Sequence, residues 1–162
     1  MERLTPRVRW VWMVGALVRA SILVTVLLLA ASYAIFVFEV GGGRPEALLA
    51  VAALGFVWIV FVVVHAWFRY RVWRFEVQSD ALFIRRGVFT RIKTVAPYVR
   101  IQHVDTRRNP IERATGLATV VVYTAGSRSA DVSIPGLTPE RAENLREELR
   151  RLTIESEGED AV

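Results

Sequence analysis

Two long hydrophobic stretches without a charged residue, residues 20–38 and 47–68, dominate the N-terminal part of the chain. Each is about 20 residues long, and a helix of that length, at 1.5 Å per residue, covers the roughly 30 Å hydrocarbon core of a bilayer. The short segment between them, residues 39–46, contains glycines and a proline and favours an antiparallel connection. The pattern predicts a hairpin of two transmembrane helices. The alternative for the first stretch is a signal peptide cleaved near residues 29–32, but its charged lead and long apolar run favour a retained span.

Basic and aromatic residues flank the outer ends of both stretches. The connecting segment holds two glutamates and one arginine. Because positively charged flanks stay in the cytoplasm, we expect a multi-pass protein of the cell membrane with both termini cytoplasmic. Trp and Tyr at the same ends are typical of an interfacial belt. The simplest interpretation of His65 is an interfacial residue near the end of the second helix. The flanking arginines are Arg3, Arg7, Arg9 and Arg19 before or within the first helix, and Arg69, Arg71 and Arg74 after the second.

Beyond residue 69 the pattern changes to short alternating runs. Residues 71–78 place Trp73, Phe75 and Val77 on one face and polar side chains on the other, which is typical of a half-buried strand. Turn residues at 79–80 make a hairpin with the next run. A short helical turn is expected at 109–116, where an Asn cap, a Pro and a terminal Gly occur together. The further strands are predicted at residues 81–86, 88–96, 100–107, 117–124 and 130–134, the last ended by the Pro-Gly at 135–136.

One amphipathic helix follows the strands. Thr138 is its expected N-cap and Pro139 its first residue. Leu145, Leu149 and Leu152 recur at helical spacing, so this stripe must be buried against the sheet. Residues 155–162 are acidic and lack large apolar side chains apart from the last valine, and we expect a disordered tail.

This order of elements predicts the fold class. A membrane hairpin of two transmembrane helices precedes a mainly-β domain of six to seven antiparallel strands, capped by a C-terminal α-helix. Such an order is that of a pleckstrin-homology-like (PH-like) open barrel. The expected divisions are a cytoplasmic N-terminal segment (1–16), the hairpin (17–69), a cytoplasmic PH-like domain (70–154) and the acidic tail (155–162).

The run "VAPYVRIQHVDTRRNPIERATGLATVVVYTAG", followed by "IPGL", resembles the bacterial PH-like membrane proteins of the YdbS-like family. The resemblance implies two N-terminal spans with one cytoplasmic PH-like domain, and it implies no enzymatic activity. It also implies membership of membrane assemblies that include a larger relative with several PH-like domains. The residues that carry it are Pro97, Arg100, Ile101, Gln102, His103, Val104, Arg113, Gly116, Leu117, Ala118 and Val120.

The sequence contains few of the residue types and motifs that catalytic sites use. There is no cysteine and only two histidines, which excludes disulfides and thiolate chemistry and leaves almost nothing for a metal site. No cofactor is predicted. His103 and Asp105 lie two apart on one strand face, about 7 Å from each other, without a Ser or Cys nucleophile motif. The structural alternative makes the motif a loop framework, with Arg113 tied to Asp105 or a carbonyl and Gln102 holding backbone groups. We expect no enzyme and no catalytic residue.

The net charge of +5 comes almost entirely from arginine and suits anionic partners. Because these residues follow the membrane topology, we expect anionic lipids of the inner leaflet rather than nucleic acid. Exposed sheet edges also suit protein contacts, either a homo-oligomer or a complex with a larger PH-like membrane relative. The predicted function is a non-catalytic adaptor or scaffold of the cell envelope; the alternatives are a specific lipid-headgroup sensor and, less favoured, an enzyme using His103 and Asp105. The lipid-facing candidates are Arg69, Arg71, Arg74, Arg85, Arg86, Arg91 and Lys93.

Overall fold

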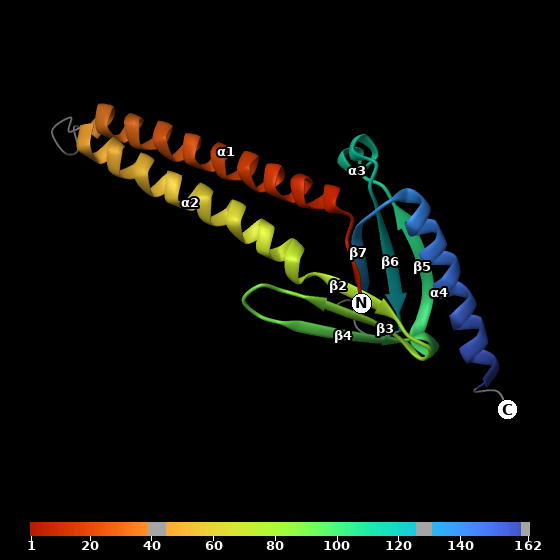
Figure 1. The fold of residues 1–162 in the computed structure, drawn as a ribbon. Helices are drawn as coiled ribbons and strands as arrows, with labels where there is room; N and C mark the ends of the chain where they lie inside the picture. The colour runs from red at the N-terminus through yellow and green to blue at the C-terminus, as the bar shows by residue number, and fades with distance from the viewer. Residues whose placement is uncertain (39–44, 126–130, 160–162) are drawn as a thin grey trace. The chain divides into compact units, whose positions relative to one another are not determined.

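The computed structural model describes residues 1–38, 45–125 and 131–159 (Figure 1). The chain divides into two compact units. One is Trp10–Phe68, and the other combines Met1–Arg9 with Arg69–Val162. The segment expected to connect the two spans, and the turn expected before the last strand, lie largely outside the described residues.

Two long helices form the first unit. Helix α1 runs over Pro6–Phe38 and helix α2 over Pro45–Val72, which confirms the predicted pair of helices. Their mean hydropathies reach 2.4 and 2.9 over membrane-length windows, and almost none of those residues is buried. Core helices of soluble proteins bury such side chains, so this exposure fits contact with lipid. The helices approach closely at Gly55, where a Cβ atom would lie 2.6 Å from Cγ1 of Val24.

Two separate antiparallel sheets form most of the second unit. The first has the order β1-β2-β3-β4 and the second the order β5-β6-β7. In the described part of the chain no hydrogen-bonded strand pair joins them, so the predicted open barrel is in fact a pair of open sheets. The strands are β1 (Glu2–Arg3), β2 (Arg74–Val77), β3 (Ala81–Arg86), β4 (Ile92–Pro97), β5 (Ile101–Arg107), β6 (Ala118–Thr124) and β7 (Val132–Leu137).

Helix α4 (Pro139–Glu159) covers the core of this unit. Its Ala142, Leu145 and Leu149 are fully buried, whereas Leu152 of the predicted stripe is half-buried. The helix contacts β5, β6 and the short 3-10 helix η2 (Tyr98–Arg100). Tyr98 is the largest fully buried side chain, and its hydroxyl donates a 2.5 Å hydrogen bond to the carbonyl of Gln78. Burial, with smaller effects from Glu148 and Asp80, raises the pKa of Tyr98 to about 12.

Several predicted boundaries are wrong by a few residues. Residues 71 and 72 continue helix α2 rather than begin a strand, and β4 starts only at Ile92 because a turn occupies residues 87–90. Strand β7 does not stop before Pro135 but continues to Leu137. Helix α4 extends to Glu159, so residues 155–159 are helical where the composition predicted disorder.

Residues 2 and 3 form a strand of the β-domain, so the first nine residues belong to that domain rather than to a separate segment. Strand β1 pairs with β2, and Leu4 and Val8 are each only 2 % exposed. The amide of Thr5 donates to the carbonyl of Gly136 at 3.0 Å. The guanidinium of Arg141 holds both carboxylate oxygens of Glu2, at 2.9 and 2.7 Å. This pairing raises the pKa of Arg141 and fastens the beginning of the chain to helix α4.

Gly136 makes this docking geometrically feasible. Its φ of +70° is strained for any residue with a side chain, and a Cβ atom there would lie 2.5 Å from Cγ2 of Val8. The "IPGL" segment therefore needs its glycine for two reasons, the left-handed backbone and the space for Val8.

We expect Gly136→Ala to lower the free energy of unfolding by about 1–3 kcal/mol, because it combines backbone strain with a clash against Val8. Thermal unfolding of the detergent-solubilised full chain, followed by near-ultraviolet circular dichroism, measures the change. Gly15→Ala is the matched control, since Gly15 is helical and only the flexible guanidinium of Arg19 lies near, at 3.4 Å. Equal effects of the two substitutions would contradict this explanation.

Candidate functional site

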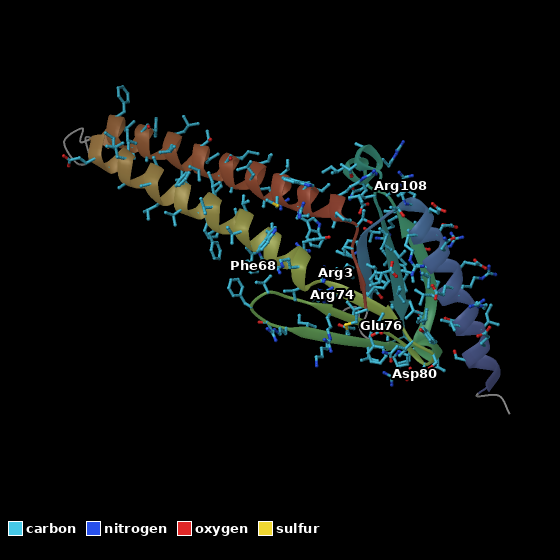
Figure 2. All side chains as sticks on the ribbon, in the orientation of Figure 1. Arg3, Phe68, Arg74, Glu76, Asp80 and Arg108 are labelled. Carbon is cyan, nitrogen blue, oxygen red and sulfur yellow. The ribbon has the colours of Figure 1, made fainter. Side chains whose placement is uncertain are left out.

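A row of four cations crosses the first sheet. Arg3 is directly opposite Arg74, Arg74 is opposite Arg85, and Arg85 is opposite Lys93. Residues directly opposite in a sheet point to the same face, so the four side chains stand on one side (Figure 2, where Arg3 and Arg74 are labelled). Buried Phe75 and Ile84 occupy the next row and point into the core.

Like charges opposite one another destabilise a sheet. Among the described residues, no carboxylate makes an ion pair with any member of this row. The nearest acidic residue along β2 on the same face, Glu76, is engaged by the amino group of Met1 at 3.3 Å. The row is therefore a concentration of positive charge that the described side chains leave uncompensated.

A pocket of about 350 Å³ lies at the end of helix α2, and Arg74, Arg85 and Lys93 of the cation row are among the residues that line it. Five cationic side chains line it and none of its lining residues is acidic. The structure thus brings together five of the seven basic candidates predicted from the sequence; the other two, Arg69 and Arg71, lie in the last turn of α2 and do not line the pocket. The lining residues are Val72, Arg74, Arg85, Arg86, Arg91, Ile92 and Lys93.

Apolar side chains are exposed beside these cations. The turn between β3 and β4 begins at Gly87, whose φ is +95°, and presents Phe89 with 77 % of its surface exposed. Ile92 is also exposed. Cationic and apolar side chains side by side are the combination that attaches protein surfaces to anionic bilayers.

His103, one member of the predicted His103–Asp105 pair, lies against an aromatic ring. The imidazole of His103 stacks on the ring of Tyr123, with centroids 4.1 Å apart, and it makes no hydrogen bond to Asp105. The guanidinium of Arg107 donates to the hydroxyl of Tyr123 and lies over its ring. In the described residues, no group of three or more His, Cys, Asp or Glu side chains is arranged to hold a metal ion. The cluster is an exposed aromatic and cationic surface of β5 and β6.

The turn after β5 is a closely hydrogen-bonded framework. Helix α3 (Pro110–Thr115) has a capping box, in which Asn109 accepts from the amide of Glu112 at 2.8 Å and Glu112 accepts from the amide of Asn109 at 2.9 Å. Gly116 ends it in the left-handed conformation, with φ +67°. Glu112 also accepts from Thr119 at 2.5 Å.

The expected tie from Arg113 to Asp105 is absent from the described structure. Arg108 makes the corresponding connection instead, because its Nε donates to the carbonyl of Leu117 at 3.2 Å. The sequence offered no means of choosing between these arginines, since each is close enough along the chain to reach back to the turn.

The motif residues divide between the core and the surface. Ile101 and Leu117 are buried, and the carbonyl of Arg100 accepts from the amide of Ala125 at 2.7 Å. Pro97 ends β4. Gln102 and His103 are exposed at a bulge, where the pairing of β5 with β6 shifts between Ile101 and His103. The motif therefore combines a folding framework with a short exposed segment.

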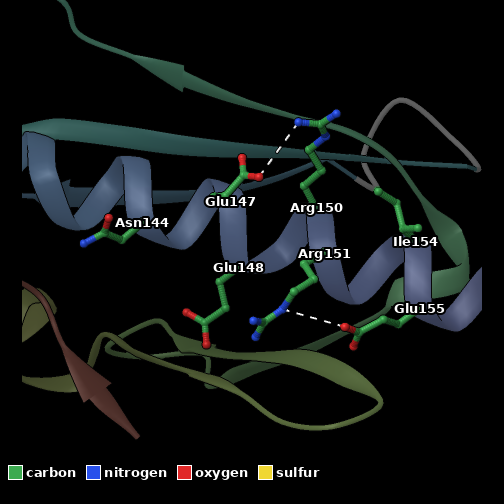
Figure 3. A pocket seen from close by; sticks show the side chains of 7 residues that line it. All are labelled: Asn144, Glu147, Glu148, Arg150, Arg151, Ile154 and Glu155. Atoms are coloured by element: carbon green, nitrogen blue, oxygen red, sulfur yellow. Dashed lines mark ion pairs between the residues drawn. The ribbon is translucent and has the colours of Figure 1, made fainter.

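A second surface hollow lies along helix α4 (Figure 3). Its charges are paired: Glu147 with Arg150 at 3.9 Å, Glu155 with Arg151 at 3.8 Å, and Glu148 with Arg141 outside the hollow at 3.5 Å. Exposed pairs of this kind contribute little energy and create no net field. The basic pocket at the end of α2 is therefore the stronger candidate site.

Comparison of the chain with known proteins identifies its family. The model of the family described as "Bacterial PH domain" matches residues 11–153. The chain belongs to the bacterial PH domain family. It is 39 % identical over 103 residues to the UPF0699 transmembrane protein YdbS of Bacillus subtilis (strain 168), covering 64 % of this chain and 62 % of YdbS. It is 25 % identical over 115 residues to the UPF0699 transmembrane protein YdbT of the same organism, covering 69 % of this chain and 23 % of YdbT.

The matched region thus spans less than two thirds of either relative. No solved structure matches the chain. The comparisons make this a PH-like transmembrane protein, as the motif residues predicted, and they assign the basic pocket no ligand.

We expect Arg85→Thr to raise the free energy of unfolding by about 0.5 kcal/mol at low salt. The substitution removes the repulsion between Arg85 and the two cations opposite it, Arg74 and Lys93. Thr also suits a strand. High salt should abolish the gain, since ions screen exposed charges. Chemical denaturation of the full chain in detergent at two salt concentrations measures both effects. A loss of stability at low salt would mean that Arg85 stabilises the free protein.

Proposed function

We propose that this chain is a non-catalytic, membrane-anchored adaptor of the cell envelope whose PH-like domain binds anionic phospholipid headgroups through the basic pocket. The observation that supports this most directly is the uncompensated cation row that runs into a pocket lined by five basic side chains. Evolution tolerates such a destabilising arrangement most readily where a ligand supplies the missing negative charge.

Arginine suits phosphate in particular. Its planar guanidinium donates two parallel hydrogen bonds to phosphate oxygens, and four of the five cations around the pocket are arginines. Each basic residue near an anionic surface contributes about 1 kcal/mol, so several together exceed thermal energy severalfold. Since the spans already hold the domain at the membrane, this energy would orient the domain rather than recruit it.

A specific lipid-headgroup sensor is the second candidate. The grouping of five cations around one hollow favours it over diffuse attraction, because cations at defined positions can select one headgroup by shape. The short β2–β3 turn at residues 78–80 counts against a phosphoinositide ligand, since PH domains that bind phosphoinositides commonly use this connection. Both candidates need the same cations, and they differ in whether headgroup identity changes binding at equal charge.

Both ends of the hairpin belong to one folded unit, which supports the placement of both termini on the same side of the membrane. The arginine-rich flanks favour the cytoplasmic side. The chain has no cysteine, so single-cysteine variants report topology without background. In intact cells, we expect a membrane-impermeant maleimide to label Glu46→Cys and to leave Glu147→Cys unlabelled until the cells are lysed. The reverse pattern would contradict the cytoplasmic placement.

The lipid proposal is tested with the full chain in nanodiscs. Phe89→Cys carries an environment-sensitive fluorophore at the exposed turn, and neutral and anionic phospholipid discs are compared. We expect a blue shift in anionic discs only, weakened by high salt. The triple variant Arg85→Ser, Arg86→Ser, Arg91→Ser should lose most of the shift.

The matched control for this variant removes the same charge elsewhere, by Arg146→Ser, Arg150→Ser and Arg151→Ser on helix α4. It should retain the shift. If the two triple variants behave alike, net charge rather than the pocket determines the contact. If neither lipid composition nor salt changes the fluorescence, the lipid-binding function is wrong and the adaptor acts through protein contacts alone.

A further inference from the structure

Strand β5 is an edge strand with a groove beside it. The second sheet has the order β5-β6-β7, so β5 pairs with β6 on one side and, among the described residues, with no strand on the other. Helix α4 runs next to this free edge (Figure 1). Between them lies a groove of about 410 Å³, with one wall from residues 101–104 of β5 and the other from α4. An edge of this kind offers unpaired backbone donors and acceptors to an added strand.

The groove has an apolar part and a positively charged rim. Val104 and the exposed Ile154 provide apolar surface, whereas Arg146 and Arg150 stand on the α4 wall. None of its lining residues is acidic. Arg146 is paired with Glu143 at 2.5 Å, but the pair of Arg150 with Glu147 is long, 3.9 Å, and both side chains are largely exposed. Arg150 can therefore turn to an incoming carboxylate with little loss.

The polar residue at the bulge is directed to the same groove. Gln102 lines it, and the pairing register of β5 with β6 passes from Ile101 to His103 without including Gln102. Its side chain makes no hydrogen bond to another described residue. An amide at such a position can donate to and accept from a neighbouring backbone, as asparagine and glutamine side chains do in strand recognition.

We infer that this groove binds an extended segment of a partner protein, which adds to the edge of β5 as a strand and carries an acidic side chain toward Arg150. Alternate side chains of the segment would point to Val104 and Ile154, and the rest to solvent. The charge of the lining residues argues for an acidic segment. The opposing wall argues for a single strand, because α4 leaves no room for the further strands that a second copy of this sheet would bring.

This interaction surface is separate from the basic pocket on β2–β4 and does not depend on lipid binding. The test therefore uses the full chain in neutral nanodiscs, where the proposed lipid contact is absent. A displayed library of random linear peptides is selected against these discs, after removal of peptides that bind empty discs. We expect enriched peptides to alternate apolar and polar residues around an aspartate or glutamate.

Two variants at adjacent positions test whether the enriched peptides bind in the groove. Arg150 and Arg151 are equally exposed, 69 % and 70 %, but only Arg150 lines the groove. Arg150→Glu should weaken an enriched peptide by about tenfold or more, as expected for reversing a charge contact. Arg151→Glu should change its affinity by less than about twofold. Thermal unfolding confirms that both variants are folded.

Backbone pairing is tested on the peptide itself. In an added strand, alternate N–H groups point to β5, so N-methylation of one alternate set should abolish binding and methylation of the other should not. The inference is overturned if no peptide is enriched, if both arginine variants bind alike, or if the two methylated sets are equivalent. It is also overturned if the free chain is a dimer that Val104→Cys links through a disulfide, since the occupant is then a second copy.

Discussion

The pairing of strand β1 with β2 is the constraint on which the rest of this protein depends. It places Met1–Arg9 inside the folded unit that also contains Arg69–Val162. The polypeptide therefore leaves one β-domain, passes through two apolar helices and returns to the same domain. Buried Leu4 and the carboxylate of Glu2 against Arg141 stabilise this closure. A fragment that began after the second helix would lack an edge strand and part of its core.

The same pairing extends the positive face. With β1 in place, the row of cations reaches across all four strands of the first sheet, from Arg3 to Lys93. Stability alone would not select such a row, because its members repel one another and no described carboxylate compensates them. The N-terminal strand thus links two properties of the molecule, the continuity of its core and the charge of the surface proposed to meet anionic lipid.

The second sheet differs from the first in what its residues do. Its "RIQHVDTRRNPIERATGL" segment contains the residues that hold the connection between β5 and β6. These are the buried Ile101 and Leu117, the capping box of α3 and the left-handed Gly116. Gln102 and His103 are exposed at the bulge beside helix α4. In this chain the motif therefore has a structural explanation, because its buried residues and its capping residues hold one turn and the strands beside it.

The sequence by itself determined the two apolar helices, the succession of most strands along the chain, the cap of α3 and the helix that packs on the domain, since each depends on local periodicity or on turn chemistry. It also named seven basic residues, five of which meet in one pocket. It could not supply the register of the strands, so it did not show that Arg74, Arg85 and Lys93 lie directly opposite one another. It also missed β1, whose two residues carry no strand signal. Only the tertiary structure decided these features, because pairing between strands brings together residues that are far apart along the chain, and local periodicity does not record which strands pair or in which register.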